Sequence, residues 1–297
     1  MKQRTVRSMM AAWMFGLGAL GVAGAADLPV AMDGKCPVCL VKMNKVVEGK
    51  AELASEYDGK TYRFPSAEQK KMFDADPAKF VPALGGDCTV CLVDMGKHVP
   101  GKAEHALVHE GRLFLFPAQE QLDTFKKNPA KYADADLALG GDCPVCLVKM
   151  NKVVKGDPAY AVVHDGLRYL FPSAEQKQMF EKGPAAFTPA LGGDCVVCKV
   201  EMKKAVPGKA EFHTVHNGRL YLFPGQEQLD MFKKNPSKYA DADVALGGKC
   251  AVCKVEMNKD VAGKAEFAVD YQGQRYLFPD AKLRDKFLAN PAKYATN

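Results

Sequence analysis

The chain has few of the features that mark catalytic or nucleic-acid-binding proteins. Its positive and negative side chains nearly balance, at a formal net charge of +6, and they form no concentrated basic patch. This balance argues against nucleic acid or an anionic membrane surface as a partner. No carboxylate pair, Ser-His-Asp set or phosphate-binding glycine loop stands out, so we expect the chain not to be an enzyme.

Long apolar runs are also scarce, and the one that occurs lies at the N-terminus. Three basic residues precede an apolar stretch at 9–22, and small residues follow up to Ala25. This order is typical of a secretory signal peptide at 1–25, with a retained signal anchor as the alternative. Its removal would take away the one tryptophan, Trp13, and lower the net charge to +3. We expect an exported chain, periplasmic or secreted, whose mature form has no membrane span.

Cysteine is absent outside five copies of one motif, C-x2-C-x3-M. The copies are Cys36, Cys39 and Met43; Cys88, Cys91 and Met95; Cys143, Cys146 and Met150; Cys195, Cys198 and Met202; Cys250, Cys253 and Met257. Two thiols and a thioether are suitable ligands for a soft ion such as Cu(I). An exported protein also closes such cysteine pairs as local disulfides, and methionine is often a flexible core residue, so both alternatives stay open.

The motifs belong to a larger internal repeat. Their first cysteines lie 52, 55, 52 and 55 residues apart, so the full period is 107 residues and two slightly different modules alternate. Self-similarity of this kind indicates an array of small modules, not one large core. We place modules 1 to 5 at 26–82, 83–137, 138–189, 190–244 and 245–297.

Each module is predicted to be a small α+β unit. We expect the C-x2-C motif in a loop beside a glycine pair, followed by a hairpin at 52–57 and 60–64 in module 1. A capping residue, Ser66, then starts a helix whose apolar face includes Phe73. A further helical turn begins at Pro77 and ends in an aromatic residue.

Three segments together resemble the YHS domain, a relative of the TRASH-type heavy-metal-binding modules. They are the C-P-V-C start at Cys36, the stretch from Tyr57 to Phe64, and the N-P-x-K-Y ending near Tyr132. The resemblance covers the whole mature chain and implies metal traffic, resistance or sensing. It also implies a metal ion as the partner, and a metal-donor or acceptor protein.

One departure from that family affects the choice of metal. Members often carry two further cysteines after the conserved phenylalanine, which complete a four-sulfur site. The first of these positions is proline in every module, at Pro65, Pro117, Pro172, Pro224 and Pro279. A tetrahedral zinc site therefore lacks ligands within one module, which favours Cu(I) over zinc, although zinc stays possible.

Lysine and histidine near the motifs have two interpretations each. A lysine two residues after each methionine, such as Lys45, would favour a thiolate, or it is simply a solvated loop residue. His109, His164 and His216 occupy the position of Tyr57 and Tyr271. This exchange favours an aromatic ring on a hairpin over a metal ligand, although histidine is a common ligand.

The sequence therefore predicts an exported string of five modules, each with a soft-metal site. Such a protein would buffer, sequester or hand on metal by ligand exchange at exposed dithiolates. Two alternatives differ in class: an interaction repeat protein with five disulfides, and a thiol-disulfide exchange protein.

Overall fold

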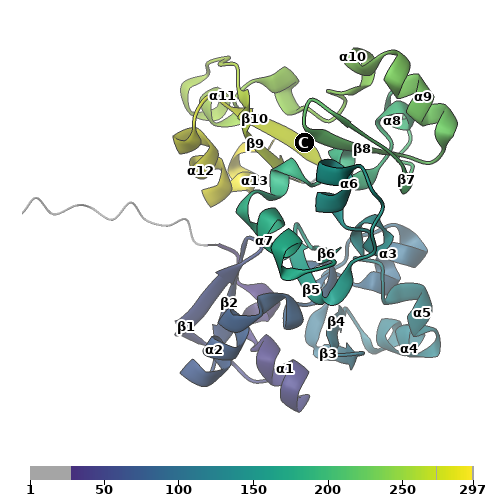
Figure 1. Cartoon of the computed structure of the whole chain (residues 1–297). Coiled ribbons are helices and arrows are strands. Elements are labelled where there is room, and N and C mark those ends of the chain that lie inside the picture. Colours follow the sequence, from purple (N-terminus) through teal and green to yellow (C-terminus); the bar gives the residue numbers. More distant parts are fainter. Residues whose placement is uncertain (1–27, 272, 296–297) are drawn as a thin grey trace, which may run out of the picture.

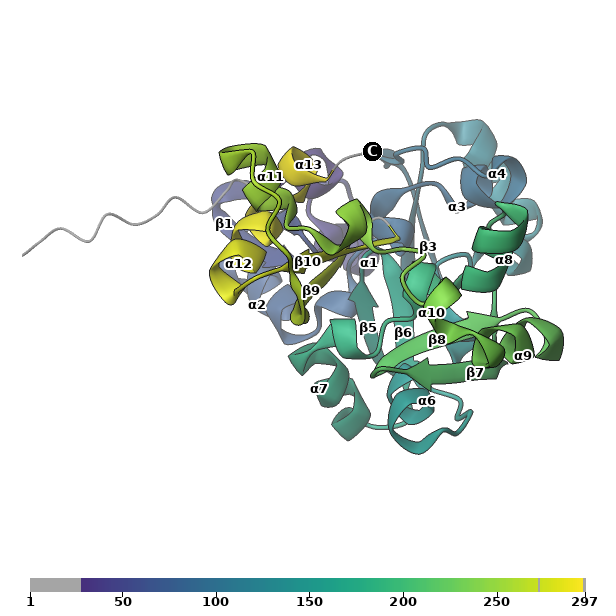
Figure 2. The same cartoon turned by 90° about the horizontal axis from the view of Figure 1, so that it is seen from above.

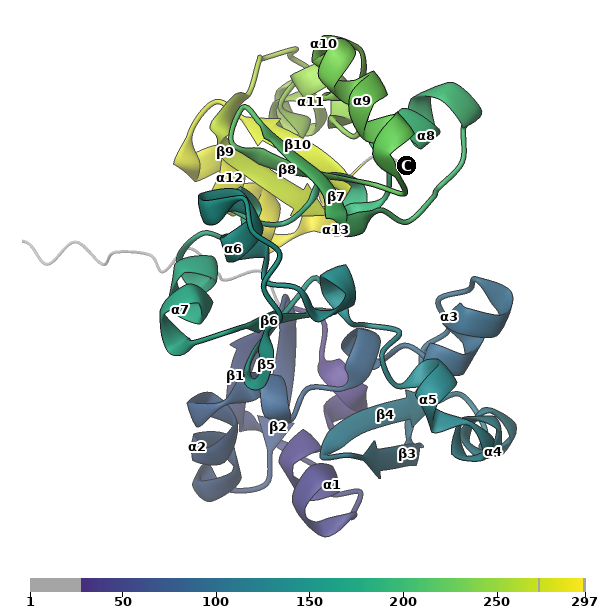
Figure 3. The ribbon, with the colours of Figure 1, turned by 45° about the vertical axis from the view of Figure 1, so that its right-hand side comes forward.

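The chain folds as five tandem α+β modules, as the sequence predicts. A computed structural model describes residues 28–271 and 273–295, and the predicted signal peptide at 1–25 lies outside these ranges. Every sheet in the described part is a two-stranded antiparallel hairpin, one per module. Module 3 lies in the middle, with modules 1 and 2 on one side and modules 4 and 5 on the other (Figures 1 and 3).

The elements recur in the same order along the chain. Modules 1 and 2 contain η1 (Ala31–Gly34), α1 (Pro37–Met43), β1 (Lys50–Tyr57), β2 (Lys60–Phe64), α2 (Ala67–Ala75), η2 (Pro77–Lys79), then η3 (Ala83–Gly86), α3 (Thr89–Met95), β3 (Lys102–His109), β4 (Arg112–Phe116), α4 (Gln119–Lys127) and α5 (Pro129–Tyr132). Modules 3 and 4 contain η4 (Ala138–Gly141), α6 (Pro144–Met150), β5 (Asp157–His164), β6 (Leu167–Phe171), α7 (Ala174–Lys182), η5 (Pro184–Ala186), then η6 (Ala190–Gly193), α8 (Val196–Met202), β7 (Lys209–His216), β8 (Arg219–Phe223), α9 (Gln226–Lys234) and α10 (Pro236–Tyr239). Module 5 contains η7 (Ala245–Gly248), α11 (Ala251–Met257), β9 (Lys264–Tyr271), β10 (Gln274–Phe278), α12 (Ala281–Ala289) and α13 (Pro291–Tyr294).

The C-x2-C motif lies at the start of a seven-residue helix, so the prediction of a loop was wrong. Cys36 is the N-cap of α1, and Pro37 supplies the fixed φ angle that suits the first helical position. Asn44 ends the helix at φ 52°, and the next amide, that of Lys45, donates to the Cys39 carbonyl at 3.3 Å. This closure is a Schellman motif, which satisfies the last carbonyls of a helix too short to persist alone.

The hairpins agree with the predicted ranges and are closed by tight turns. Asp58 and Gly59 both have positive φ angles, 48° and 68°, as a type I′ turn requires. The strand register shifts between Lys50 and Ala54, which marks a bulge. At this bulge a Cβ on Gly49 would lie 2.4 Å from the Arg63 carbonyl carbon, so only glycine fits there. The same close approach occurs at Gly101, Gly156, Gly208 and Gly263.

One phenylalanine of the long helix is the centre of each module's core. In module 1, Phe73 is fully buried and its ring lies 5.0 Å from the rings of both Tyr62 and Phe64. The hairpin residue Tyr57 meets it edge-on, at 6.3 Å and 89°. The equivalent central residues are Phe125, Phe180, Phe232 and Phe287. Aromatic packing of this kind adds about 0.5–1.5 kcal/mol per pair beyond the area that it buries.

Neighbouring modules pack through the outer face of the cysteine helix. Leu40 of α1 lies in a buried cluster with Leu113 and Leu115 of the module 2 hairpin. Leu147 of α6 lies in the same way against Leu220 and Leu222 of module 4. Modules 1 and 2 and modules 3 and 4 are therefore paired, in agreement with the 107-residue period.

Buried aspartates join one pair to the next module. Both carboxylate oxygens of Asp136 accept from Arg112 of module 2 at 2.6 Å, and its carbonyl accepts from the Arg168 amide of module 3 at 2.7 Å. Asp243 takes the same place between Arg219 of module 4 and module 5. The link from an even module to the next odd one therefore contains a buried aspartate whose carboxylate pairs with an arginine.

The odd-numbered modules also contact one another directly. The Val163 amide of module 3 donates to the Tyr57 hydroxyl of module 1 at 3.1 Å. One period later, the Thr188 hydroxyl of module 3 donates to Asp270 of module 5 at 3.0 Å. Seen from above, modules 1 and 5 overlie each other on one side, and modules 2 and 4 occupy the other (Figure 2). Within the described ranges, none of the helices is both long and apolar enough to cross a membrane.

Candidate functional site

Each module contains a pair of buried free thiols at the start of its cysteine helix. All ten cysteines are free, and each is 2% exposed or less. The first sulfur of each pair accepts from the backbone amide of the second cysteine, as in the 3.3 Å contact from the Cys39 amide to Cys36 Sγ. The remaining four pairs show this contact at 3.1 to 3.3 Å.

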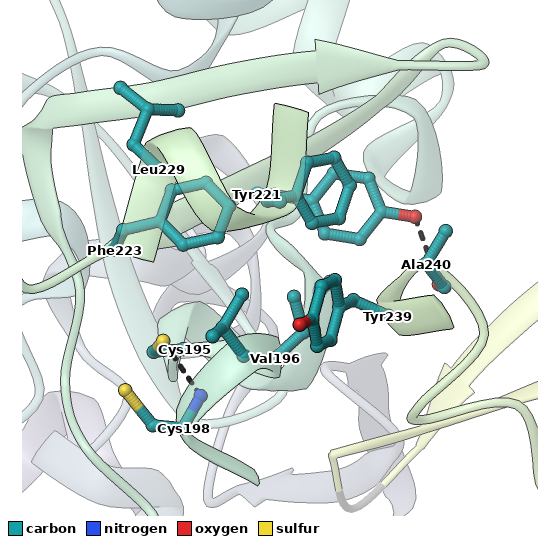
Figure 4. Close-up of a cluster of buried hydrophobic side chains, with 11 residues drawn as sticks. Cys195, Val196, Cys198, Tyr221, Phe223, Leu229, Tyr239 and Ala240 are labelled. Carbon is teal, nitrogen blue, oxygen red and sulfur yellow. Dashed lines mark hydrogen bonds between the residues drawn. The ribbon is translucent and has the colours of Figure 1, made fainter. Parts of the chain in front are cut away.

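The surroundings of the thiols are apolar and aromatic. In module 4, Cys195 and Cys198 belong to one buried cluster with Phe223 and Tyr239. Both sulfur atoms point to the same side of the first helical turn (Figure 4). The backbone holds this turn in place, because the Cys195 amide donates to the Val206 carbonyl at 2.8 Å. Every first cysteine makes the same contact with the following loop.

Burial favours the protonated form of the thiols. It raises the pKa of Cys36 to about 12, and a hydrogen bond with the Cys39 thiol adds to the shift. Backbone amides of the helix start act in the opposite direction, but the loss of solvation outweighs them. One thiol in each other module is shifted to the same value for the same first reason, at Cys91, Cys143, Cys195 and Cys253.

The methionines occupy the opposite end of the same helix. Met43 follows Cys39 by four residues and Cys36 by seven, so helical periodicity places all three on one side. The thioether is nevertheless at the surface: the five methionines are 48–54% exposed. The interpretation of the methionines as core residues is therefore wrong. We also expected an exposed dithiolate, whereas the structure has buried thiols at the start of the helix and an exposed thioether at its end.

No group of three His, Cys, Asp or Glu ligands within 4.8 Å of one another includes a cysteine in the described part of the chain. Lys45 and its counterparts are exposed, as solvated loop lysines are. The His109, His164 and His216 rings pack edge-on against the central phenylalanines, as Tyr57 does, so an aromatic ring at this position completes the core of each module.

Sequence reasoning missed one cluster of ligand atoms. Asp58 of module 1 lies beside His164 and Asp165 of module 3, with the three ligand atoms within 4.8 Å of one another. Asp58 and Asp165 are equivalent positions one period apart, so their contact depends on how modules 1 and 3 pack. The one local signal was the adjacent pair of His164 and Asp165.

Comparison with known proteins assigns no family to this array. No protein-family model matches the chain, and no solved structure matches it. The chain is similar to adenylate kinase 9 of Mus musculus, at 26% identity over 160 residues. That match covers 51% of this chain and spans only 7% of the length of the mouse protein.

This similarity corrects one expectation. The sequence led us to expect that the chain is not an enzyme, whereas the relative carries the name of one. The match is too distant and too short to establish an activity here. The fold and the site together define the class of protein, which is a tandem array of five small α+β modules, each with a buried cysteine pair.

Proposed function

We propose that the chain is an exported protein that stores or buffers a soft metal ion, most suitably Cu(I), at its five cysteine pairs. The observation that carries the proposal is the same buried, free dithiol in every module. Thiolates select soft ions, and Cu(I) accepts a low coordination number. A tetrahedral zinc site needs two further ligands, and no third His, Cys or carboxylate ligand accompanies a pair in the described residues.

Burial makes a dithiolate without a counterion costly, and a bound cation would offset part of that cost. Two buried negative charges without a counterion are costly, which is why the pKa of Cys36 rises to about 12. A monovalent cation between two thiolates leaves one net negative charge in place of two. Metal uptake must then release the thiol protons, and its affinity must rise with pH.

The exposed methionine supports a role in ion entry. Met150 lies at the surface end of α6, and both cysteines of that helix are buried. A thioether is a soft, weak ligand that can take an ion from solvent or from a donor protein before the thiols bind it. The resemblance to YHS domains is in keeping with this role, and a metal-donor or acceptor protein is the partner that it implies.

Neither alternative gains comparable support from the site. Thiol-disulfide exchange needs an accessible thiolate with a low pKa, whereas these thiols are buried and burial raises the pKa. Local disulfides are compatible with the C-x2-C spacing, but the structure holds the thiols free.

A competition titration with a coloured Cu(I) chelator, under anaerobic and reducing conditions, tests the proposal. The full chain is expected to remove up to five Cu(I) ions from the chelator, and the double variant Cys143→Ser, Cys146→Ser one fewer. Met150→Leu is the matched variant at the helix end, and it should retain five ions with a slower uptake at one site. Circular dichroism checks that each variant is folded. Five ions bound by the double variant would contradict the proposal.

A further inference from the structure

A second kind of ligand cluster lies where modules 1 and 3 meet. It consists of Asp58, in the β1–β2 turn, and His164 and Asp165, at the end of β5 and in the turn that follows. His164 and Asp165 lie 106 and 107 positions after Asp58 in the chain. One ligand atom from each lies within 4.8 Å of the other two, a separation that a single metal ion can bridge.

Backbone contacts fix the position of the Asp58 carboxylate. One oxygen accepts from the Asp165 amide at 2.6 Å, and the other accepts from the Gly166 amide at 2.9 Å. A carboxylate offers about four lone-pair positions, so each oxygen keeps one for a further partner. The turn of module 1 is therefore held against the turn of module 3, and each carboxylate oxygen of Asp58 can still accept a further partner.

The side chains of His164 and Asp165, in module 3, are free to accept a ligand. The His164 ring packs edge-on against Phe180 at 5.8 Å, which fixes its orientation. Its Nε2 atom lies 3.7 Å from Asp165 Oδ2, too far for a hydrogen bond. Neither side chain makes a hydrogen bond within the described ranges. They are 29% and 47% exposed, so an ion can reach them from solvent.

The other modules carry the same fold without this cluster. The equivalent histidines are followed by Glu110 in module 2 and Asn217 in module 4, and no third ligand joins them in the described part of the chain. At the contact between modules 3 and 5, Tyr271 replaces the histidine. The ligand set thus depends on both the module 1 to module 3 packing and the residues that differ there.

We propose that Asp58, His164 and Asp165 bind one divalent cation of the Mn²⁺ or Zn²⁺ type, which fastens module 1 to module 3. Two carboxylates and an imidazole suit such ions and carry two negative charges to match them. The site is independent of the cysteine pairs, whose sulfur ligands select softer ions.

The charge distribution around Asp165 supports a cation. The Asp58 and Asp165 carboxylates lie close together where modules 1 and 3 meet, so their like charges act against each other. A bound cation would place positive charge between two carboxylates that otherwise repel each other.

Mn²⁺ is the appropriate probe, because it prefers oxygen and nitrogen ligands and binds thiolates weakly. The electron paramagnetic resonance signal of free Mn²⁺ is measured as the full reduced chain is added. One bound ion per chain is expected. His164→Tyr, which copies modules 1 and 5, should weaken binding at least tenfold, as should Asp165→Asn. His216→Tyr makes the same exchange in module 4 and should leave the affinity unchanged.

Thermal unfolding separates a metal site from a merely structural role. Millimolar Mn²⁺ should raise the melting temperature of the wild-type chain and of His216→Tyr, and should not change that of His164→Tyr. Absence of binding in the wild type would overturn the proposal. Equal weakening by His164→Tyr and His216→Tyr would overturn it as well, because it would indicate an adventitious ion only. Failure here would leave the cysteine sites untouched, since their assay uses Cu(I).

Discussion

The first cysteine of each module is subject to two opposed effects. As the N-cap of a helix, Cys36 receives a backbone amide on its sulfur, an arrangement that favours the thiolate. Complete burial among aromatic rings disfavours the same charge, and burial is the larger effect. The pair is therefore expected to be an unreactive dithiol at neutral pH, which agrees better with the proposed storage role than with redox catalysis.

This balance predicts an unusual pH dependence for thiol modification. In the metal-free native chain, alkylation by iodoacetamide should stay slow through about pH 9 and accelerate only toward the pKa of about 12. Chain unfolded in guanidinium should react with a midpoint near the ordinary cysteine value. Rapid modification of the native chain at neutral pH would contradict the account.

The same shift has a consequence for stability. The folded pKa of Cys143 lies above the ordinary value of 9.0, so the folded state retains a proton that the unfolded chain releases between pH 9 and about 12. This contribution to stability is complete below pH 9 and is lost as the pH rises through that window.

At the residue scale, the sequence predicted which residues form the repeated candidate site better than it predicted their surroundings. The repeated sulfur pattern identified the cysteine pairs, and the exchange of His109 for Tyr57 correctly indicated an aromatic packing position. It gave no sign that the thiols would be buried. It also gave no reason for Gly49, because the clash that excludes a side chain there comes from the backbone of Arg63, across the hairpin.

Among the elements, the cysteine helix shows most clearly why local signals were insufficient. Valine and cysteine are poor helix formers, and seven residues are too few for an isolated helix. The helix exists because both of its ends are closed: the Cys36 amide donates to the Val47 carbonyl, and Asn44 ends the last turn. The hairpins and long helices, in contrast, contain turn and capping residues, such as Asp58 and Ser66, whose structural effect can be predicted from the local sequence.

Two residues change together between two kinds of module: the last aromatic residue of the module and the residue of the cysteine helix that it contacts. In modules 2, 4 and 5 a tyrosine hydroxyl donates to an acid of the cysteine helix, as Tyr239 donates to Glu201 at 2.8 Å. Module 3 has Phe187 in place of the tyrosine and Lys149 in place of the acid, with the ammonium over the ring at 5.9 Å. Each exchange keeps the last aromatic ring attached to the cysteine helix. Module 5 follows the even modules in this respect, although its hairpin has the tyrosine of module 1.

The ion pair between even and odd modules provides a test at this scale. Asp243→Ala removes the hydrogen-bonded partner of the buried Arg219 and leaves only Asp270, at 3.6 Å, so we expect a loss of about 3 kcal/mol in the free energy of unfolding. Asp260→Ala breaks exposed contacts to Lys249 and Lys254 and should have a much smaller effect, because exposed ion pairs are screened by solvent. Guanidinium unfolding followed by circular dichroism measures both. Equal effects would show that burial does not decide the strength of this contact.

For the whole molecule, the 107-residue period predicted duplication but not packing. Val81 of module 1 and Val163 of module 3 lie in one apolar cluster, whereas the equivalent residues one period later, Thr188 and Asp270, form a hydrogen bond. The two contacts have similar positions and different chemistry. Only the folded arrangement shows this, because each partner alone resembles an ordinary surface or hairpin residue.

The array also accounts for the stability of modules that are individually small. A domain of this size buries too little apolar surface to be more than marginally stable alone. The clusters around Leu40 and Leu147 and the aspartate contacts at Asp136 and Asp243 add buried surface between modules. The fold of each module is therefore supported by its neighbours, and the proposed metal ions are not needed to explain it.

Native mass spectrometry of the chain, isolated from cells without reductant, tests most directly whether the cysteine pairs hold metal. The account predicts copper adducts of up to five ions per chain, with the maximum reduced by one when the two cysteines of one module are replaced by serine. A metal-free mass about ten daltons below that of the reduced chain would mean five closed disulfides. That result would contradict metal storage and favour the interaction repeat protein.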